Sequence, residues 1–166
     1  MKKILAITSL FFMLILFSQC GPTMTDARNY NEELITEQKK VINAIDALEN
    51  SFSTFNTETI SVELEKTKKQ LASSITSLEK LGSFDEKTEF YDATMELYKM
   101  FEKQLNNEYS EQLEIYKLSD ENYTKEKENR FNELSNIIDN EYDIISKKML
   151  SIQQKFVDSW GLELKK

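Results

Sequence analysis

Histidine is absent from the 166-residue chain, and this absence removes several kinds of catalytic and metal site. Catalytic triads use an imidazole base, while most zinc sites and the Glu-x-x-His di-iron sites of helical bundles use imidazole ligands. The single cysteine, Cys20, has no partner for a disulfide within the chain. We therefore expect a fold held by packing, with no catalytic residues, no bound metal and no cofactor.

Glycine and proline are scarce, with three and one occurrences. Gly21 and Pro22 follow the cysteine directly, so the remainder of the chain contains Gly82 and Gly161 and no other residue of these two types. Glu, Lys, Leu, Asn and Ser are abundant. Because helix breakers are few and helix formers many, the composition favours long helices over sheets.

The N-terminal segment differs in character from everything after it. Lys2 and Lys3 make a positive start, and residues 4–17 form an apolar run interrupted by Thr8 and Ser9. About fourteen residues are too few for a bilayer-spanning helix, which needs ~20. A cationic start followed by a short apolar run is typical of a secretory signal peptide.

The junction Phe17-Ser18-Gln19-Cys20 resembles the lipobox of bacterial lipoproteins, in which the cysteine is acylated and becomes the first mature residue. Ser18 and Cys20 match that pattern, whereas Phe17 is larger than usual and Gln19 replaces a small residue. The resemblance implies lipidation of Cys20 and residence in the bacterial envelope, at the outer membrane rather than the inner one, with the leaflet open. Ordinary cleavage, or an uncleaved anchor with a free thiol, is the alternative.

The predicted mature chain is strongly acidic. We expect a signal peptide at 1–19, a flexible tether at 20–28 and a helical bundle domain at 29–164. Removing Lys2 and Lys3 from the 21 basic residues leaves 19 against 29 acidic ones, a net charge of about −10. Such a chain gains no counterion-release attraction to nucleic acid. Nucleic acid is therefore not an expected partner, and the membrane is expected to hold the protein through acyl chains on Cys20.

Apolar residues recur every three or four positions in four stretches of the chain, at 30–55, 60–81, 84–116 and 131–160. This period predicts four amphipathic helices. The polar stretch at 56–59 separates the first two, and Gly82 ends the second. Ser83 with Glu86 predicts a capping box that opens the third helix, and a turn is expected near Ser119.

Short connections between amphipathic helices favour antiparallel neighbours. We therefore predict an all-α, up-down-up-down four-helix bundle. The third and fourth helices, at ~35 to 40 residues, would be ~50 to 60 Å long, and the first two shorter. The longer hairpin should project beyond the shorter one, which leaves residues 116–131 at an overhanging tip.

Two short motifs suggest chemistry and are better explained without it. Ser77-Leu78-Glu79-Lys80 matches the Ser-x-x-Lys of penicillin-binding enzymes, but the partner motifs that this chemistry needs are missing. Asp139, Glu141 and Asp143 alternate like the start of an EF-hand loop, yet Ile144 stands where that loop needs glycine. We interpret the first as chance and the second as a solvated helix face.

Aromatic residues form the most distinctive series in the chain. Tyr91, Tyr98 and Tyr109 lie at helix-face spacing and are expected in the core. Tyr116 and Tyr123 fall near the predicted tip, where a core role and a partner-binding role are both open, because exposed aromatics are frequent in binding hot spots.

Two segments resemble a family of uncharacterised bacterial surface proteins first described in leptospires and found also in Bacteroidetes. These are residues 30–38 (YNEELITEQ) and 154–164 (QKFVDSWGLEL). The resemblance implies a surface or envelope lipoprotein, and it brings no catalytic residue with it.

Two functions are compatible with this sequence. The first is a non-enzymatic envelope lipoprotein whose bundle binds another envelope or surface protein, or acts as a structural spacer. The alternative is a bundle that encloses a small ligand, a lipid or peptide, beside the polar gaps Gln38, Thr67 and Ser74 in its apolar stripes. A continuous pocket of a few hundred cubic ångströms would favour the second.

Overall fold

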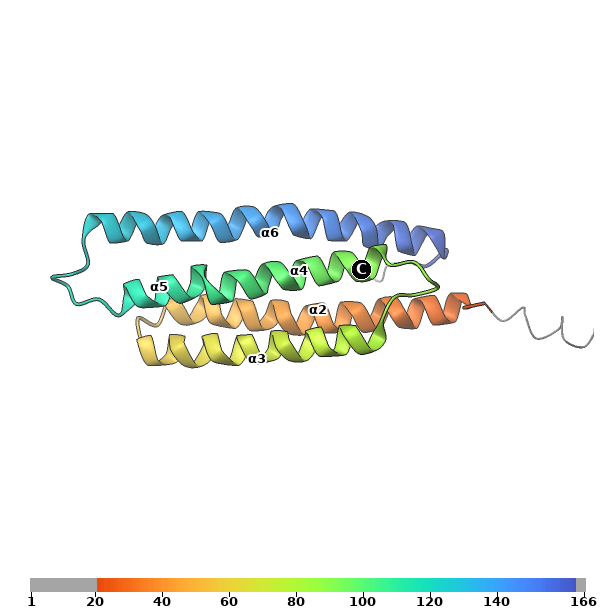
Figure 1. Ribbon diagram of the computed structural model, residues 1–166, viewed down its shortest axis with the longest axis horizontal. Helices are drawn as coiled ribbons and strands as arrows, with labels where there is room; N and C mark the ends of the chain where they lie inside the picture. Colours follow the sequence, from red (N-terminus) through yellow and green to blue (C-terminus); the bar gives the residue numbers. More distant parts are fainter. Residues whose placement is uncertain (1–20, 164–166) are drawn as a thin grey trace, which may run out of the picture.

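The computed structural model describes residues 21–163, and Figure 1 shows that they form a bundle of antiparallel helices. No strand occurs within this range. The predicted all-α fold is therefore confirmed for the described part of the chain. The expected signal peptide at 1–19 and the expected lipidation site Cys20 lie outside the described residues.

Helix α2 (Met24–Phe52) begins earlier than the sequence suggested. Thr23 caps it: the Asp26 backbone N–H donates to Thr23 Oγ1 at 3.2 Å, and the Thr23 backbone N–H donates to the Asp26 carboxylate at 2.8 Å. This reciprocal capping box satisfies two donors that a helix start otherwise leaves free. The flexible tether expected over 20–28 is thus wrong for residues 24–28, which are helical, and Ala27 is fully buried.

Helix α3 (Thr57–Leu81) has the ends that the sequence predicts. The Thr59 backbone N–H donates to the Asn56 side chain at 3.0 Å, which caps the first turn. At the other end Gly82 adopts φ 67°, a left-handed conformation that glycine reaches without steric cost, and its N–H donates to Leu78 O.

The predicted capping box at Ser83 and Glu86 is wrong. Asp85 and Glu86 have φ values of 52° and 60°, and the third helix starts only at Glu89. The reason is tertiary: the ring of Phe84 packs 5.1 Å from Tyr30, 5.7 Å from Phe156 and 5.3 Å from Trp160, measured between ring centroids. Phe84 is partly buried by these contacts, and this packing favours the loop at residues 82–88.

The third helix is broken into α4 (Glu89–Asn106) and α5 (Glu108–Tyr116), which corrects the prediction of one helix of ~35 to 40 residues. Asn107, at φ −113° and ψ −75°, departs from ideal helical angles, although its N–H still donates to Lys103 O at 2.9 Å. Ser110 Oγ donates to Leu105 O at 2.7 Å, so a side chain satisfies a carbonyl at the break. The fourth helix, α6 (Lys125–Ser159), is continuous over 35 residues, or about 52 Å.

The helices run up-down-up-down, with their two ends distinct (Figure 1). We call the end with residue 21, the 82–88 loop and Gly161 the proximal end. The distal end holds the 53–56 turn and the 117–124 loop. Figure 1 shows the 117–124 loop reaching beyond the 53–56 turn, so the predicted projection of the second hairpin is confirmed.

The core follows the predicted apolar stripes. The buried aliphatic residues of these stripes include Leu34, Val41, Leu48, Ile60, Leu71, Leu78, Leu105 and Leu134. Leu97 and Val157, which the stripes did not include, are buried as well. Tyr98 and Tyr109 are buried as predicted, and Tyr91 packs against the core. Within residues 21–163, no helix combines the length and apolar character that crossing a bilayer requires.

Candidate functional site

Two surfaces of the bundle are candidates for binding. The first is an aromatic cluster at the distal end, formed by Phe52, Phe55, Tyr116 and Phe131, with Tyr123 beside it. The second is a cleft between α2 and α6. We refer to them as the distal aromatic cluster and the α2–α6 cleft.

Tyr116, a predicted partner-binding residue, is the centre of the distal aromatic cluster. Its ring centroid lies 5.3 Å from that of Phe52 and 5.4 Å from that of Phe131, and its hydroxyl donates to Phe52 O at 3.2 Å. Partial burial, followed by the proximity of Tyr123, raises the pKa of Tyr116. Because its edges are packed and its hydroxyl is bonded, Tyr116 holds the 53–56 turn and α6 together.

Phe55 is the most exposed large hydrophobic residue described, with 81% of its surface accessible. The sequence period placed it in the first apolar stripe, and this is wrong. Phe55 has φ 55°, a left-handed conformation that costs a non-glycine residue roughly 1–2 kcal/mol. Its ring lies 6.2 Å from that of Tyr116 and otherwise faces solvent. The sequence contained a signal for this exposure, because Phe55 directly precedes the polar stretch at 56–59, where the spacing of apolar residues is interrupted.

Tyr123, the second predicted partner-binding residue, lies in the 117–124 loop and is 44% exposed. The loop is closed by its own hydrogen bonds: the Asn122 and Tyr123 backbone N–H groups both donate to Ser119 O, at 2.8 and 3.0 Å. The Asn122 side chain also donates to Ser119 Oγ at 2.9 Å. Tyr123 is therefore presented on an ordered turn.

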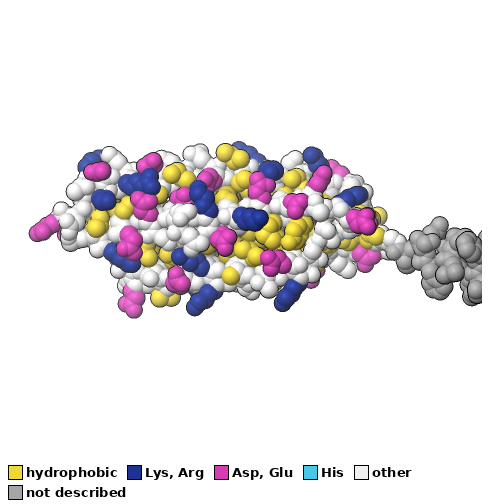
Figure 2. Space-filling model, viewed as in Figure 1, with side chains coloured by type: hydrophobic (Ala, Val, Ile, Leu, Met, Phe, Trp, Pro, Cys, Tyr) yellow, Lys and Arg dark blue, Asp and Glu magenta, His cyan; other side chains and the backbone are white. Residues whose placement is uncertain are grey.

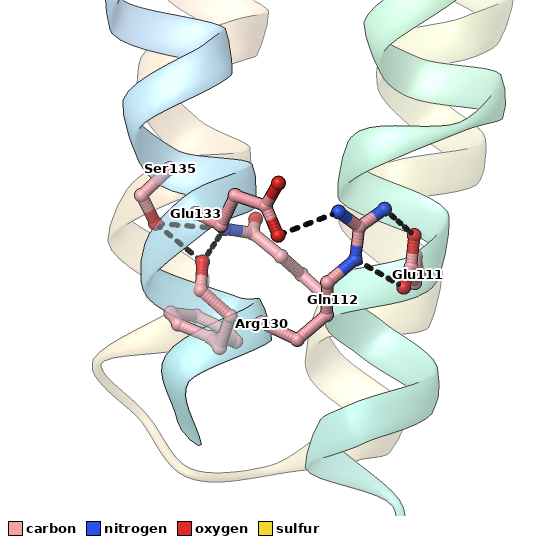
Figure 3. A network of polar contacts seen from close by, with 6 residues as sticks. Glu111, Gln112, Arg130, Glu133 and Ser135 are labelled. Carbon is pink, nitrogen blue, oxygen red and sulfur yellow. Dashed lines mark hydrogen bonds and ion pairs between the residues drawn. The ribbon is translucent and has the colours of Figure 1, made fainter. Parts of the chain in front are cut away.

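A polar network fixes the distal ends of α5 and α6 against each other (Figure 3). The Arg130 guanidinium donates to both oxygens of Glu111, each at 2.8 Å, and to Glu133 at 2.8 Å. These bonds raise the pKa of Arg130, and the two to Glu111 lower the pKa of that carboxyl. Beside them, Gln112 Nε2 donates to Ser135 Oγ at 2.8 Å and to Phe131 O at 3.5 Å. A paired fork of this kind sets orientation.

The α2–α6 cleft comprises two neighbouring cavities of about 240 Å³ each, which share part of their lining. Both are lined by Glu49, Tyr109, Ile138 and Asp139. The first adds an apolar floor of Ile42, Ile45 and Phe101, with Tyr142 and Asp46 at the rim. Phe101 and Tyr142 pack with ring centroids 5.8 Å apart.

Acidic groups dominate the electrostatics of the cleft. The Tyr109 hydroxyl donates to Glu49 Oε1 at 2.5 Å. The pKa of Tyr109 is raised far above its ordinary value, mainly because the hydroxyl is buried. The hydrogen bond to Glu49 and the charges of Glu49, Asp139 and Asp46 raise it further. On the face shown in Figure 2, acidic and basic side chains are interspersed. The described residues that line the cleft, in contrast, include no lysine or arginine.

The polar residues that interrupt the apolar stripes, Gln38, Thr67 and Ser74, do not line this cleft. The prediction of a ligand pocket beside them is therefore wrong for the α2–α6 cleft. Gln38 Nε2 donates to Thr94 Oγ1 at 3.0 Å and contacts Met149 Sδ at 3.4 Å. Thr67 Oγ1 donates to Ala44 O at 3.0 Å, and Ser74 Oγ donates to Glu37 Oε2 at 2.9 Å. All three are buried and satisfied by contacts between helices.

The two short motifs lie in unbroken helix. Ser77 and Lys80 are in the last turns of α3, while Asp139, Glu141 and Asp143 are within α6, where no loop can wrap an ion. Among residues 21–163, no group of three His, Cys, Asp or Glu side chains is arranged to hold a metal ion.

No protein-family model, curated protein or solved structure matches this chain. The resemblance to the leptospiral and Bacteroidetes surface proteins therefore stays a prediction.

Proposed function

We propose that this protein is a lipid-anchored component of the bacterial envelope whose helical bundle is a non-catalytic binding module for another envelope or surface protein. The signal-peptide pattern and the lipobox-like junction at Cys20 support the anchor. Attachment at Cys20 sets the proximal end next to the membrane. The distal aromatic cluster then lies the length of the bundle away, facing outward.

The observation that carries this proposal is Phe55. The ring of Phe55 is 81% exposed and lies beside Tyr116, at the end opposite the proposed anchor, and the backbone of Phe55 is in the left-handed region. Such a ring contributes little buried area to the monomer and carries a conformational cost. Aromatic side chains supply much of the energy of protein interfaces, so a partner that covers Phe55 and Tyr123 would use both.

The test is site-specific crosslinking in the native envelope. A photo-reactive phenylalanine analogue at position 55 or 123 is expected to form the same adduct with one envelope protein. The control places the analogue at Ile144, which is 66% exposed in the middle of α6. Equal labelling from position 144, or no adduct from 55 and 123, would contradict partner binding at the distal end.

The anchor has its own test. Labelling with a palmitate analogue is expected to mark the wild-type protein and not Cys20→Ala, and protease treatment of whole cells would show on which side of the membrane the bundle lies. A bare thiol at Cys20, found by mass spectrometry of the purified protein, would remove the anchor from the proposal.

A second candidate, small-ligand binding, is supported by the α2–α6 cleft. Its two neighbouring cavities, of about 240 Å³ each, approach the volume of known ligand sites, and the apolar floor and polar rim match the usual composition of such sites. This candidate does not need the distal aromatic cluster, so the two can be tested separately.

A further inference from the structure

Among the described side chains that line the α2–α6 cleft, nearly every hydrogen-bond donor has a partner within the protein, while several acceptors have none. Gln104 Nε2 donates to Ile138 O at 3.2 Å and to Glu141 Oε2 at 3.3 Å. The Tyr109 hydroxyl donates to Glu49, and Gln112 Nε2 to Phe131 O and Ser135 Oγ. Among the described lining residues, the rim hydroxyl of Tyr142 is the one side-chain donor without a partner.

The free acceptors are charged. Asp46 and Glu49 lie one turn apart on α2, and Asp139 faces them from α6. Neither Asp46 nor Asp139 forms an ion pair with any residue in the range 21–163, and Glu49 accepts its hydrogen bond from an uncharged phenol. Three carboxylates therefore face one cleft with no cation of the described chain opposite them.

A second, independent feature lies in the wall of the cleft. Gln104 is fully buried, and its Oε1 has no hydrogen-bond partner among the described residues. The amide orientation is determined, because Nε2 contacts two acceptors and the oxygen must be the atom left over. Gln104 is part of the lining of the first cavity, and a buried carbonyl oxygen without a donor is rare and unfavourable.

We propose that the α2–α6 cleft binds a linear aliphatic amine, with its methylene chain on Ile42, Ile45 and Phe101 and its ammonium groups toward Asp46, Glu49 and Asp139. This rests on the small-ligand candidate and names its ligand class. An ammonium group is a donor without an acceptor, which complements a cleft of acceptors. The rings of Phe101 and Tyr142 add a surface that attracts cations.

Other occupants fit the cleft less well. A peptide backbone brings carbonyl acceptors, for which the cleft has no free donor other than Tyr142. An anionic lipid headgroup would meet three carboxylates at close range. A metal ion would make no use of the apolar floor, and residues 21–163 hold no group arranged to ligate one.

The experiment is titration calorimetry on the purified full chain with spermidine as the probe. We expect saturable binding that weakens as salt is raised. The double variant Asp46→Asn/Asp139→Asn should bind about 10-fold more weakly or worse. The matched control Asp120→Asn/Glu121→Gln removes two exposed carboxylates from the 117–124 loop and should bind as wild type does.

A second variant tests the cleft by occupation. Ile42→Lys places a tethered ammonium group at a half-buried position of the cleft floor and should abolish spermidine binding while circular dichroism shows the helices intact. Unchanged binding in either cleft variant, equal binding of a neutral diol of matching length, or equal competition by Mg²⁺ would overturn the proposal.

Failure of this inference is distinguishable from failure of the small-ligand candidate. If a neutral amphiphile binds and Ile42→Lys blocks it, while spermidine does not bind, the ligand site stands and the amine is wrong. If neither binds, both are wrong. A lysine-rich peptide that binds where free amines do not would also overturn the amine proposal. Partner crosslinking at Phe55 is unaffected by any of these outcomes.

Discussion

At the scale of single residues, the surroundings of a side chain decide whether it stabilises the fold or remains available for binding. Phe52 and Phe55 lie three positions apart at the end of the same apolar stripe. Phe52 is 9% exposed and contacts Tyr109, Tyr116 and Phe131, whereas Phe55 is 81% exposed and contacts Tyr116 alone among the described rings. Identical chemistry therefore has different consequences at the two positions.

This difference predicts opposite effects on stability. Phe55→Asn puts a residue that tolerates the left-handed region at φ 55°, so the free energy of unfolding should stay unchanged or rise by up to about 1 kcal/mol. Phe52→Asn removes a buried ring and should lower it by about 3 kcal/mol or more. Urea unfolding followed by circular dichroism measures both. A loss above about 1 kcal/mol at Phe55 would mean that the ring is structural.

At the scale of elements, the helix ends show which local signals act alone and which yield to packing. The Thr23–Asp26 capping box forms with side chains exposed to solvent. The similar pair Ser83 and Glu86 does not form one. There the partly buried Phe84 packs against Tyr30, Phe156 and Trp160, and this packing outweighs a cap worth about 1 kcal/mol.

The start of α2 should therefore be sensitive to pH. Hydrogen bonds from the Thr23 hydroxyl and backbone N–H lower the pKa of Asp26 below 3.8. A carboxyl whose pKa is lower in the folded state stabilises the fold above its unfolded value, and this contribution is lost as the pH falls through the folded pKa. The difference in unfolding free energy between wild type and Asp26→Asn should thus be larger at pH 6 than at pH 3.

A control separates this effect from a general loss of charge. Asp120→Asn removes an exposed carboxylate from the 117–124 loop, outside any hydrogen bond of the described residues, and its effect should not follow the same pH dependence. Amide exchange in residues 24–28 gives a second measurement, since Thr23→Ala should speed it by fraying the first turn.

At the scale of the whole molecule, buried polar contacts set how α2 and α6 align. Gln153 Nε2 on α6 donates to Asn31 Oδ1 on α2 at 3.2 Å, and Gln38 contacts Met149 one layer further along. Apolar stripes alone allow helices to slide by a turn. A buried polar pair is satisfied in one alignment and therefore favours it, as polar core positions do in coiled coils.

This pair is suited to a double-mutant cycle. Asn31→Leu alone leaves the Gln153 amide buried without its partner and should cost about 1–3 kcal/mol. Asn31→Leu/Gln153→Leu should recover most of that loss. The free energies of unfolding of the four proteins measure the coupling. If the double variant loses the sum of the two single losses, the contact does not act as a unit.

The sequence by itself determined the helical class, the number of apolar stripes and the approximate helix ends at the 56–59 stretch and Gly82. These follow from local causes: the spacing of apolar residues, caps and the conformational freedom of glycine. It also placed Tyr98 and Tyr109 in the core and Tyr123 near an exposed tip. Each of these predictions depends on residues within a few positions of one another.

The tertiary structure alone decided the break at Asn107, the loop around Phe84, the exposure of Phe55 and the existence of the α2–α6 cleft. A stripe records that a residue is apolar, but not whether a neighbouring helix extends far enough to cover it. From the sequence, each of the residues Asp46, Glu49 and Asp139 is expected on a solvated helix face. Glu49 and Asp139 are 90 positions apart, so no local pattern relates them. They become one acidic cleft only because the fold places α2 and α6 on two sides of the same cavities, and no local sequence pattern encodes that arrangement.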